Sequence, residues 1–369
     1  MEDIKKTPEE ELQELEEQEV FEDDNPDLPP NDIVTFNELR SCSDLVRMYK
    51  TGQLEIQPDF QRDIVWKKPA QTRFIDSLVK QLPIPSICIS LDYKTNKRLV
   101  IDGLQRMQSI INFLGDKNDS WRLSKLDDVD DKISGKTVAV IKSKYPKIYD
   151  RVENLTIPIT VLRCDYSKES HMKYLFTIFH RLNTGGLKLN NQEIRNCIFN
   201  GSFNKLLKTE VKYENYRNLL GLEKDKSYRF IYEELILRFF AFFDWLDKYN
   251  GKLSAFLNEY MNKYKDADDT FISSKKHLFE RVVDLLYIRI LDSNKLPHIS
   301  KATTEGLMIG IAKNINTLEG LNDEVLKTYY DNLRNDPLYS IENLKEGLSQ
   351  KDKVVSRLNR AIEIFNGVE

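Results

Sequence analysis

Apolar residues recur along much of the chain at the spacing of amphipathic helices, with short apolar runs between them. Three helices are predicted by apolar positions at i, i+3, i+4 and i+7: Ile75, Leu78, Val79 and Leu82; Met107, Ile110, Ile111 and Leu114; and Met172, Leu175, Phe176 and Phe179. Pro69 opens the first helix and Gly115 closes the second. A further helix is expected over residues 39–49, and strands over 33–36, 54–56, 86–90, 98–102 and 157–163.

The second half of the chain is helical in pattern. Residues 230–246 predict a long buried helix, because the four charges inside this apolar stretch exclude a membrane span. Further periodic segments lie near 253–263, 277–291, 303–315, 323–333 and 353–365. We therefore expect an α+β domain with a small mixed sheet at residues 32–200 and a helical domain at 201–369. The charged stretch 116–150 is interpreted as an insertion whose structure the pattern does not predict.

Charge is distributed unevenly along the chain. Residues 1–31 carry a net charge of −11 against −4 for the whole chain, which leaves +7 for residues 32–369. An acidic arm of this composition is expected to be a disordered tail. The N-terminus lacks a signal-peptide pattern and no apolar run approaches the ~20 residues of a membrane helix, so a cytoplasmic protein without a membrane partner is expected. The scattered cysteines predict free core thiols: Cys42, Cys88, Cys164 and Cys197.

The most informative segment is the strand-to-helix turn at residues 98–106. Asp102 is predicted to cap the helix that follows, and Arg106 lies on its first turn. A helix N-terminus attracts anions, and an arginine fork suits phosphate oxygens. An equally simple interpretation is that Asp102 is only a cap and Arg106 only an ion-pair partner.

A second polar cluster follows the helix that carries Phe179. Arg181 and Asn183 flank a Gly185-Gly186 turn, and Asn190 with Glu193 forms a capping box that starts another helix. Gln192 and Arg195 add donors to this helix. A flexible joint with a helix cap explains these residues as well as a ligand does.

Four segments occur together and in a fixed order: residues 56–66, 102–106, 179–186 and 189–196. Together they resemble the N-terminal domain of GmrSD-type restriction endonucleases, a family related to the ParB/sulfiredoxin-like fold and usually marked by Asp-Gly-Gln-Gln-Arg. The resemblance covers about residues 33–245. Leu104 departs from that signature, whereas Gln105 and Arg106 keep it.

The resemblance implies nucleotide hydrolysis linked to DNA sensing, with Mg²⁺ or a similar divalent cation. It implies Asp102, Gln105 and Arg106 as catalytic residues, and Asp102 with Glu193 as metal ligands. It implies phosphate contacts by Arg62 and Arg106, while Gln61, Gln105 and Asn183 position the substrate. The full set implied to bind nucleotide or phosphate is Gln61, Arg62, Gly103, Arg181, Asn183, Gln192 and Arg195. The sequence has no Walker A motif, so a nucleotide site must be of this other kind.

The sequence therefore predicts a nucleoside triphosphate hydrolase or sensor component of a restriction or anti-phage defence system that acts with DNA. His277 and His298 lack the context of a His-Asn-His nuclease, so a separate subunit is expected to supply cleavage. A homo-oligomer is a further expectation. Two alternatives stay open, a nonenzymatic DNA-binding or assembly module and a metal-dependent ParB-like DNA nuclease.

Overall fold

The computed structural model describes residues 30–56, 66–115, 119–182, 189–223, 228, 230–297, 299–345 and 347–367. These residues form two compact units, an N-terminal unit up to Leu189 and a C-terminal unit from Asn190. The elements of the N-terminal unit are, in chain order, β1 (Val34–Ser41), α2 (Cys42–Lys50), β2 (Leu54–Glu55), α3 (Lys68–Val79), β3 (Ile87–Asp92), β4 (Arg98–Asp102), α4 (Leu104–Leu114), α5 (Val138–Lys144), α6 (Pro146–Asn154), β5 (Thr156–Cys164) and α7 (Glu169–Leu182).

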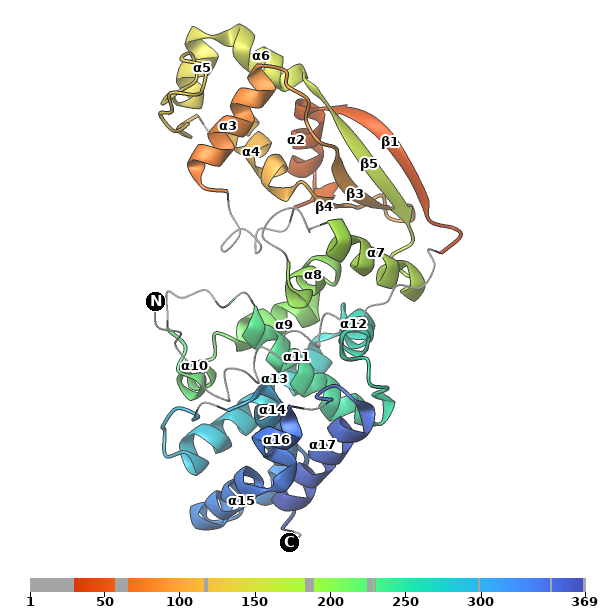
Figure 1. The fold of residues 1–369 in the computed structure, drawn as a ribbon, viewed down its shortest axis with the longest axis vertical. Helices are drawn as coiled ribbons and strands as arrows, with labels where there is room; N and C mark the ends of the chain where they lie inside the picture. The colour runs from red at the N-terminus through yellow and green to blue at the C-terminus, as the bar shows by residue number, and fades with distance from the viewer. Residues whose placement is uncertain are drawn as a thin grey trace. The chain divides into compact units, whose positions relative to one another are not determined.

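The N-terminal unit is built on a mixed five-stranded sheet with the order β1-β5-β3-β4-β2 (Figure 1). β5 pairs with β1 antiparallel and with β3 parallel, so the strand that comes last in the sequence lies inside the sheet. β3 and β4 form an antiparallel hairpin, and β2 pairs with β4 in parallel. The predicted strands are confirmed, and β1 forms one edge of the sheet.

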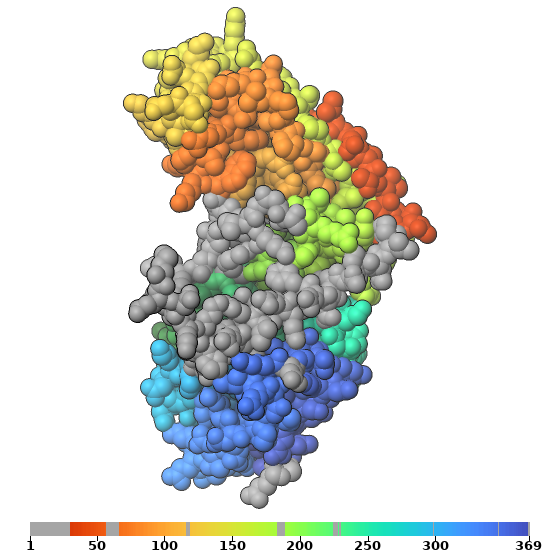
Figure 2. All heavy atoms as spheres, viewed as in Figure 1, coloured from red at the N-terminus to blue at the C-terminus, as the bar shows by residue number. Residues whose placement is uncertain are grey.

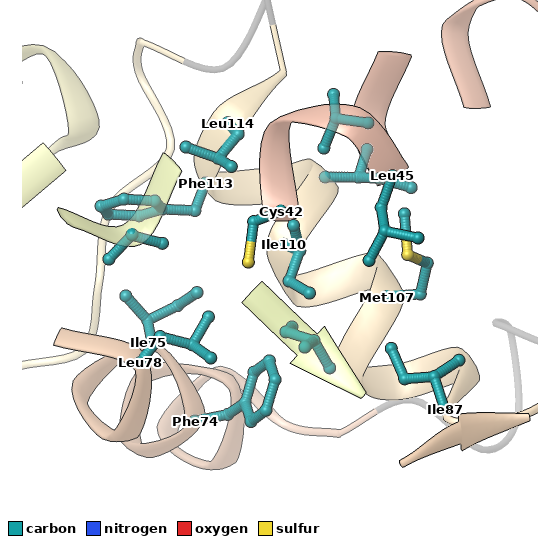
Figure 3. Packing of buried hydrophobic residues seen from close by; sticks show 14 of the residues in the cluster. Cys42, Leu45, Phe74, Ile75, Leu78, Ile87, Met107, Ile110, Phe113 and Leu114 are labelled. Atoms are coloured by element: carbon teal, nitrogen blue, oxygen red, sulfur yellow. The ribbon is translucent and has the colours of Figure 1, made fainter. Parts of the chain in front are cut away.

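One face of the sheet carries the main hydrophobic core. Alternate residues of β3 and β5, such as Ile89 and Ile159, pack with side chains from α2, α3 and α4. Figure 3 shows Leu45, Ile75 and Ile110 meeting in this core. Elsewhere in the N-terminal unit, α7 packs against β4. The predicted apolar stripe of α7 is buried, and it consists of Met172, Leu175, Phe176 and Phe179.

Three local expectations are wrong. The pattern assigns Leu39 to a helix, but it lies in β1 and α2 begins at Cys42, where the Ser41 hydroxyl accepts a hydrogen bond from the Asp44 amide. The pattern assigns Leu82 to the core, but α3 ends at Val79 and Leu82 is 49% exposed. The stretch 116–150 is not a separate insertion, because its described part forms α5, the start of α6 and loops that contribute core residues. These residues are Leu123, Val129 and Ile133.

The described residues from 190 onward form helices. They are α8 (Asn191–Ile198), α9 (Ser202–Glu210), α10 (Glu214–Leu220), α11 (Ile231–Trp245), η3 (Leu246–Lys248), α12 (Leu253–Tyr264), α13 (Asp269–Asp284), η4 (Leu285–Ile290), α14 (Lys301–Leu318), α15 (Asp323–Asn335), η5 (Pro337–Tyr339), α16 (Ile341–Leu344) and α17 (Lys351–Phe365). The long buried helix predicted over 230–246 is confirmed as α11.

The expected α+β class, with a small mixed sheet followed by a helical region, is confirmed. α8, which the sequence pattern assigns to the first domain, is the first helix of the C-terminal unit. The four cysteines are buried free thiols, as predicted. Among the described helices, none combines the length and the apolar character needed to cross a membrane.

Candidate nucleotide site

The turn between β4 and α4 is shaped by a β-bulge. Cys88 pairs with Asp102 and Ile89 with Val100, so Ile101 is an extra residue in β4. The bulge therefore places Asp102 opposite Cys88 rather than opposite the core residue Ile87. Burial, and then the nearby Asp102 carboxylate, raise the pKa of the Cys88 thiol to about 12. Bulges of this kind recur beside functional sites because they redirect a side chain.

Gly103, not Asp102, is the N-cap of α4, which corrects the sequence prediction. Asp102 is the last residue of β4, and Gly103 takes the left-handed conformation with φ of 94°. A Cβ on Gly103 would lie 3.0 Å from Ile87 Cγ1 and 3.1 Å from Arg106 Nη2. Because glycine has no side chain to cap the helix, the first N–H groups of α4 have no side-chain cap within the part of the chain that the structure describes.

Arg106 holds the carboxylate of Asp102 in place. Its Nη2 donates to Asp102 Oδ2 at 2.7 Å, and its Nη1 donates to the carbonyl oxygens of Pro85 at 2.5 Å and Ser86 at 3.2 Å. The Arg106 side chain is 12% exposed and that of Asp102 is 35% exposed. Asp102 is therefore the accessible member of the pair, and Arg106 connects it to the segment before β3.

Gln105 also makes a specific internal contact. Its Oε1 accepts a hydrogen bond from the Trp66 amide at 2.9 Å, and Gln71 Nε2 donates to the Trp66 carbonyl at 2.9 Å. The peptide groups of Trp66 are thus held by one glutamine from α4 and one from α3. Gln71 is not among the residues that the sequence singles out, because it reaches Gln105 only through Trp66 and lies far from Gln105 along the chain.

The structure brings together Asp102, Gly103, Gln105 and Arg106 from the predicted site. Gln61, Arg62 and Asn183 lie outside the described residues. Arg181 is exposed in the last turn of α7.

The predicted residues of α8 lie in the C-terminal unit. Asn190 and Glu193 form the predicted capping box: Asn190 N–H donates to Glu193 Oε2 at 2.7 Å, and Glu193 N–H donates to Asn190 Oδ1 at 2.8 Å. Gln192 is buried and donates to Asn196 Oδ1 at 3.2 Å. That Gln192, Glu193 and Arg195 line the same site as Asp102 stays a prediction.

Arg195 is fully buried inside the C-terminal unit. It donates to Asn258 Oδ1 at 2.8 Å and Glu234 Oε2 at 2.9 Å. Glu234 also faces Arg238, which forms an ion pair with Glu305 of α14. Burial alone would raise the pKa of Glu234, but the charges of Arg195 and Arg238 outweigh it and hold that pKa below its usual value. These four charged residues form an ionic chain that joins α8, α11 and α14, in which Glu234 is the most exposed member.

The turn offers a divalent cation a single carboxylate, that of Asp102. Within the described residues, Asp102 Oδ1 accepts no hydrogen bond, and no group of three or more His, Cys, Asp or Glu side chains could hold a metal ion. Mg²⁺ commonly binds through one or two carboxylates, water and substrate phosphates. Asp102 could supply one such carboxylate oxygen.

The N-terminal unit is thus an α+β unit. Its strand-to-helix turn contains a β-bulge and the sequence Asp-Gly-x-Gln-Arg, whose polar side chains are held by hydrogen bonds. Residues 42–200 match the family model described as GmrSD restriction endonuclease, N-terminal domain. The predicted resemblance is confirmed for this segment, which contains the whole turn. The match supports a restriction- or defence-related protein that acts on DNA. No curated protein and no solved structure matches the chain.

Proposed function

We propose that this protein is the nucleotide-hydrolysing or nucleotide-sensing component of a DNA-directed restriction or anti-phage defence system. The observation that carries the proposal is the β4–α4 turn, which combines an accessible Asp102 with an uncapped helix N-terminus inside the segment that matches the GmrSD family model. Free N–H groups at a helix start suit a phosphate, and a carboxylate beside them suits an attacking water.

Each residue of the turn has a role in this proposal. Gly103 supplies no capping side chain, so in this proposal the first N–H groups of α4 are available to phosphate oxygens. Asp102 is the catalytic residue and orients the attacking water. Arg106 is a positioning residue that fixes Asp102 against the carbonyls of Pro85 and Ser86. A bound Mg²⁺, held by Asp102 and the phosphates, would neutralise charge on the transferred group.

The test is phosphate release from each nucleoside triphosphate with Mg²⁺, with and without DNA. Asp102→Asn keeps the size of the side chain and is expected to lower turnover by roughly 100-fold or more. Arg106→Lys is expected to cost less, because lysine keeps the charge but not the fork that bridges Asp102 and two carbonyls. Asp128→Asn is the matched control, since Asp128 pairs with Arg73 on the surface of the same unit.

Two outcomes contradict the hydrolase. One is wild-type turnover of zero for every nucleotide tested in the presence and absence of DNA. The other is unchanged turnover in Asp102→Asn with an intact melting temperature. Metal-dependent nicking of DNA by the purified protein would favour the nuclease alternative instead.

A nonenzymatic DNA-binding or assembly module is the second candidate, and a specific observation favours it. Asp102 pairs with Arg106, Arg106 also binds the Pro85–Ser86 segment, and Gln105 binds Trp66, as residues of a structural turn would. Nucleotide binding by calorimetry without phosphate release would support this candidate.

A further inference from the structure

A cavity of about 460 Å³ lies in the C-terminal unit, where α11 and η3 meet α14 and α17. Its size falls within the range of small-molecule sites. The apolar part of its lining consists of Phe243, Leu246, Val355 and Ile362. This cavity is separate from the β4–α4 turn, and the proposed function makes no use of it.

Two lysines give the cavity a cationic rim. Lys313 of α14 and Lys351 of α17 both line it, and in the described parts of the chain neither forms an ion pair with a carboxylate. Lys313 Nζ lies 4.5 Å from the centre of the Phe243 ring. Lys351 is the first residue of α17, whose N-cap residue, Gln350, makes no side-chain cap, so the positive end of the helix dipole is on the same side.

The two acidic residues of the lining differ in their surroundings. Asp244 is already neutralised, because its Oδ1 lies 2.5 Å from Lys275 Nζ and its Oδ2 accepts from the Tyr260 hydroxyl at 2.5 Å. Asp247 lies in η3 and is the acid that would oppose an anion in the cavity. With Asp244 paired, the lysines outnumber the available carboxylate.

We propose that this cavity binds a small aromatic organic anion. The flat body of the ligand lies against Phe243, Leu246 and Val355, where it removes apolar surface from water. Its phosphate, sulfonate or carboxylate group lies between Lys313 and Lys351. A neutral analogue gains only the first of these contributions, so anion selectivity is the signature of the site.

The test uses the full chain and the fluorescent probe 8-anilinonaphthalene-1-sulfonate, with its uncharged analogue N-phenyl-1-naphthylamine as the reference ligand. The double variant Lys313→Gln, Lys351→Gln is expected to weaken binding of the sulfonate by roughly tenfold or more, because it removes two charge-assisted contacts. Binding of the neutral analogue should stay the same. Asp247→Asn is expected to tighten sulfonate binding about twofold to threefold.

Lys212→Gln is the matched control, since Lys212 lies just beyond α9 and does not line the cavity. Displacement of the probe by adenosine monophosphate identifies a nucleotide as the ligand source, and displacement by 1-naphthoate identifies an aromatic carboxylate. Equal sulfonate binding by the double variant and the wild type overturns the proposal. Displacement by neither competitor also overturns it, because the probe then reports only dye adhesion.

Discussion

Gly103 is a residue at which backbone conformation and packing both disfavour a side chain. Gly103→Ala is expected to lower the free energy of unfolding by about 2–3 kcal/mol, since φ of 94° is strained for alanine and the new Cβ would press on Ile87 and Arg106. Urea denaturation of the purified protein measures this change.

Gly52→Ala separates the cost of backbone strain from the cost of the new side-chain contacts. Gly52 has φ of 70°, and a Cβ added there would meet nothing within 4 Å, so this variant carries the backbone strain alone and should cost about 1 kcal/mol. Equal losses in the two variants would show that the contacts with Ile87 and Arg106 contribute nothing.

Glu210 makes the stability of the chain depend on pH. Its side chain is buried, its Oε2 has no hydrogen-bond partner among the described residues, and Lys276 Nζ lies 4.0 Å from its Oε1. Burial raises the pKa of Glu210 to about 7, although Lys276 opposes this shift; Glu280 adds to it.

Because the native state holds this proton more tightly than the unfolded state does, the unfolding free energy should fall as pH rises from about 4.5 to about 7. The fall due to this group is on the order of 1–3 kcal/mol. Denaturation across this pH range compares the wild type with Glu210→Gln, whose unfolding free energy should lack this fall. Parallel curves for the two proteins would contradict the assignment.

At the scale of single residues, the sequence could not predict contacts between residues that lie far apart along the chain. The Asp102 turn could be located from its residues, but the cap could not be assigned, because the bulge at Ile101 depends on pairing with β3. Arg195 has the sequence context of a ligand donor. Its burial depends on Glu234 and Asn258, which come from other helices and leave no local signal.

At the scale of elements, α8 is held by the ionic chain that starts at Arg195. Arg195→Met is expected to lower the unfolding free energy by about 2–3 kcal/mol, because it removes the arginine that donates at 2.9 Å to Glu234, whose side chain is 15% exposed, and leaves Glu234 with Arg238 at 4.0 Å. Thermal and urea denaturation measure the loss. Arg73→Ala breaks an ion pair with Asp128 whose side chains are 54% and 58% exposed, and it should change stability by less than about 1 kcal/mol. Similar losses in both variants would rule out a special cost of burial.

Helices with a continuous apolar stripe or a capping box could be predicted well. α4 and α7 have such a stripe and α8 has the capping box, and the structure contains each of these helices. The segment around α5 and α6 could not be placed, since its core residues are separated by loops and meet α3 and α2 only in three dimensions. The sequence does not show where β1 ends, because Leu39 also fits the apolar pattern of the following helix.

At the scale of the whole molecule, the N-terminal unit should fold without the C-terminal unit. Its main core is formed by side chains between Cys42 and Val161, and its sheet is complete at Cys164. A fragment of residues 30–189 is expected to keep a cooperative thermal transition and the circular dichroism of a mixed α and β protein.

A fragment of residues 30–115 is the control, because it lacks β5 and leaves β1 without a neighbouring strand. It should show no cooperative transition. Cooperative folding of the shorter fragment would mean that β5 is dispensable for this unit.

The inner position of β5 also has a consequence during protein synthesis. Val34 pairs with Arg163 of β5. Roughly 130 further residues must therefore be synthesised after β1 before its partner strand is complete. At about 5–20 residues per second this delay lasts on the order of 10 s. During that interval β1 has no sheet to join, and its backbone N–H and C=O groups lack the β5 partners that the finished unit provides. The β1 segment lies at the surface in Figure 2, and Val34, Phe36 and Leu39 stay exposed in the finished unit as well. Ribosome-associated chaperones are therefore expected to engage this protein early, at β1, and to release it once β5 has emerged.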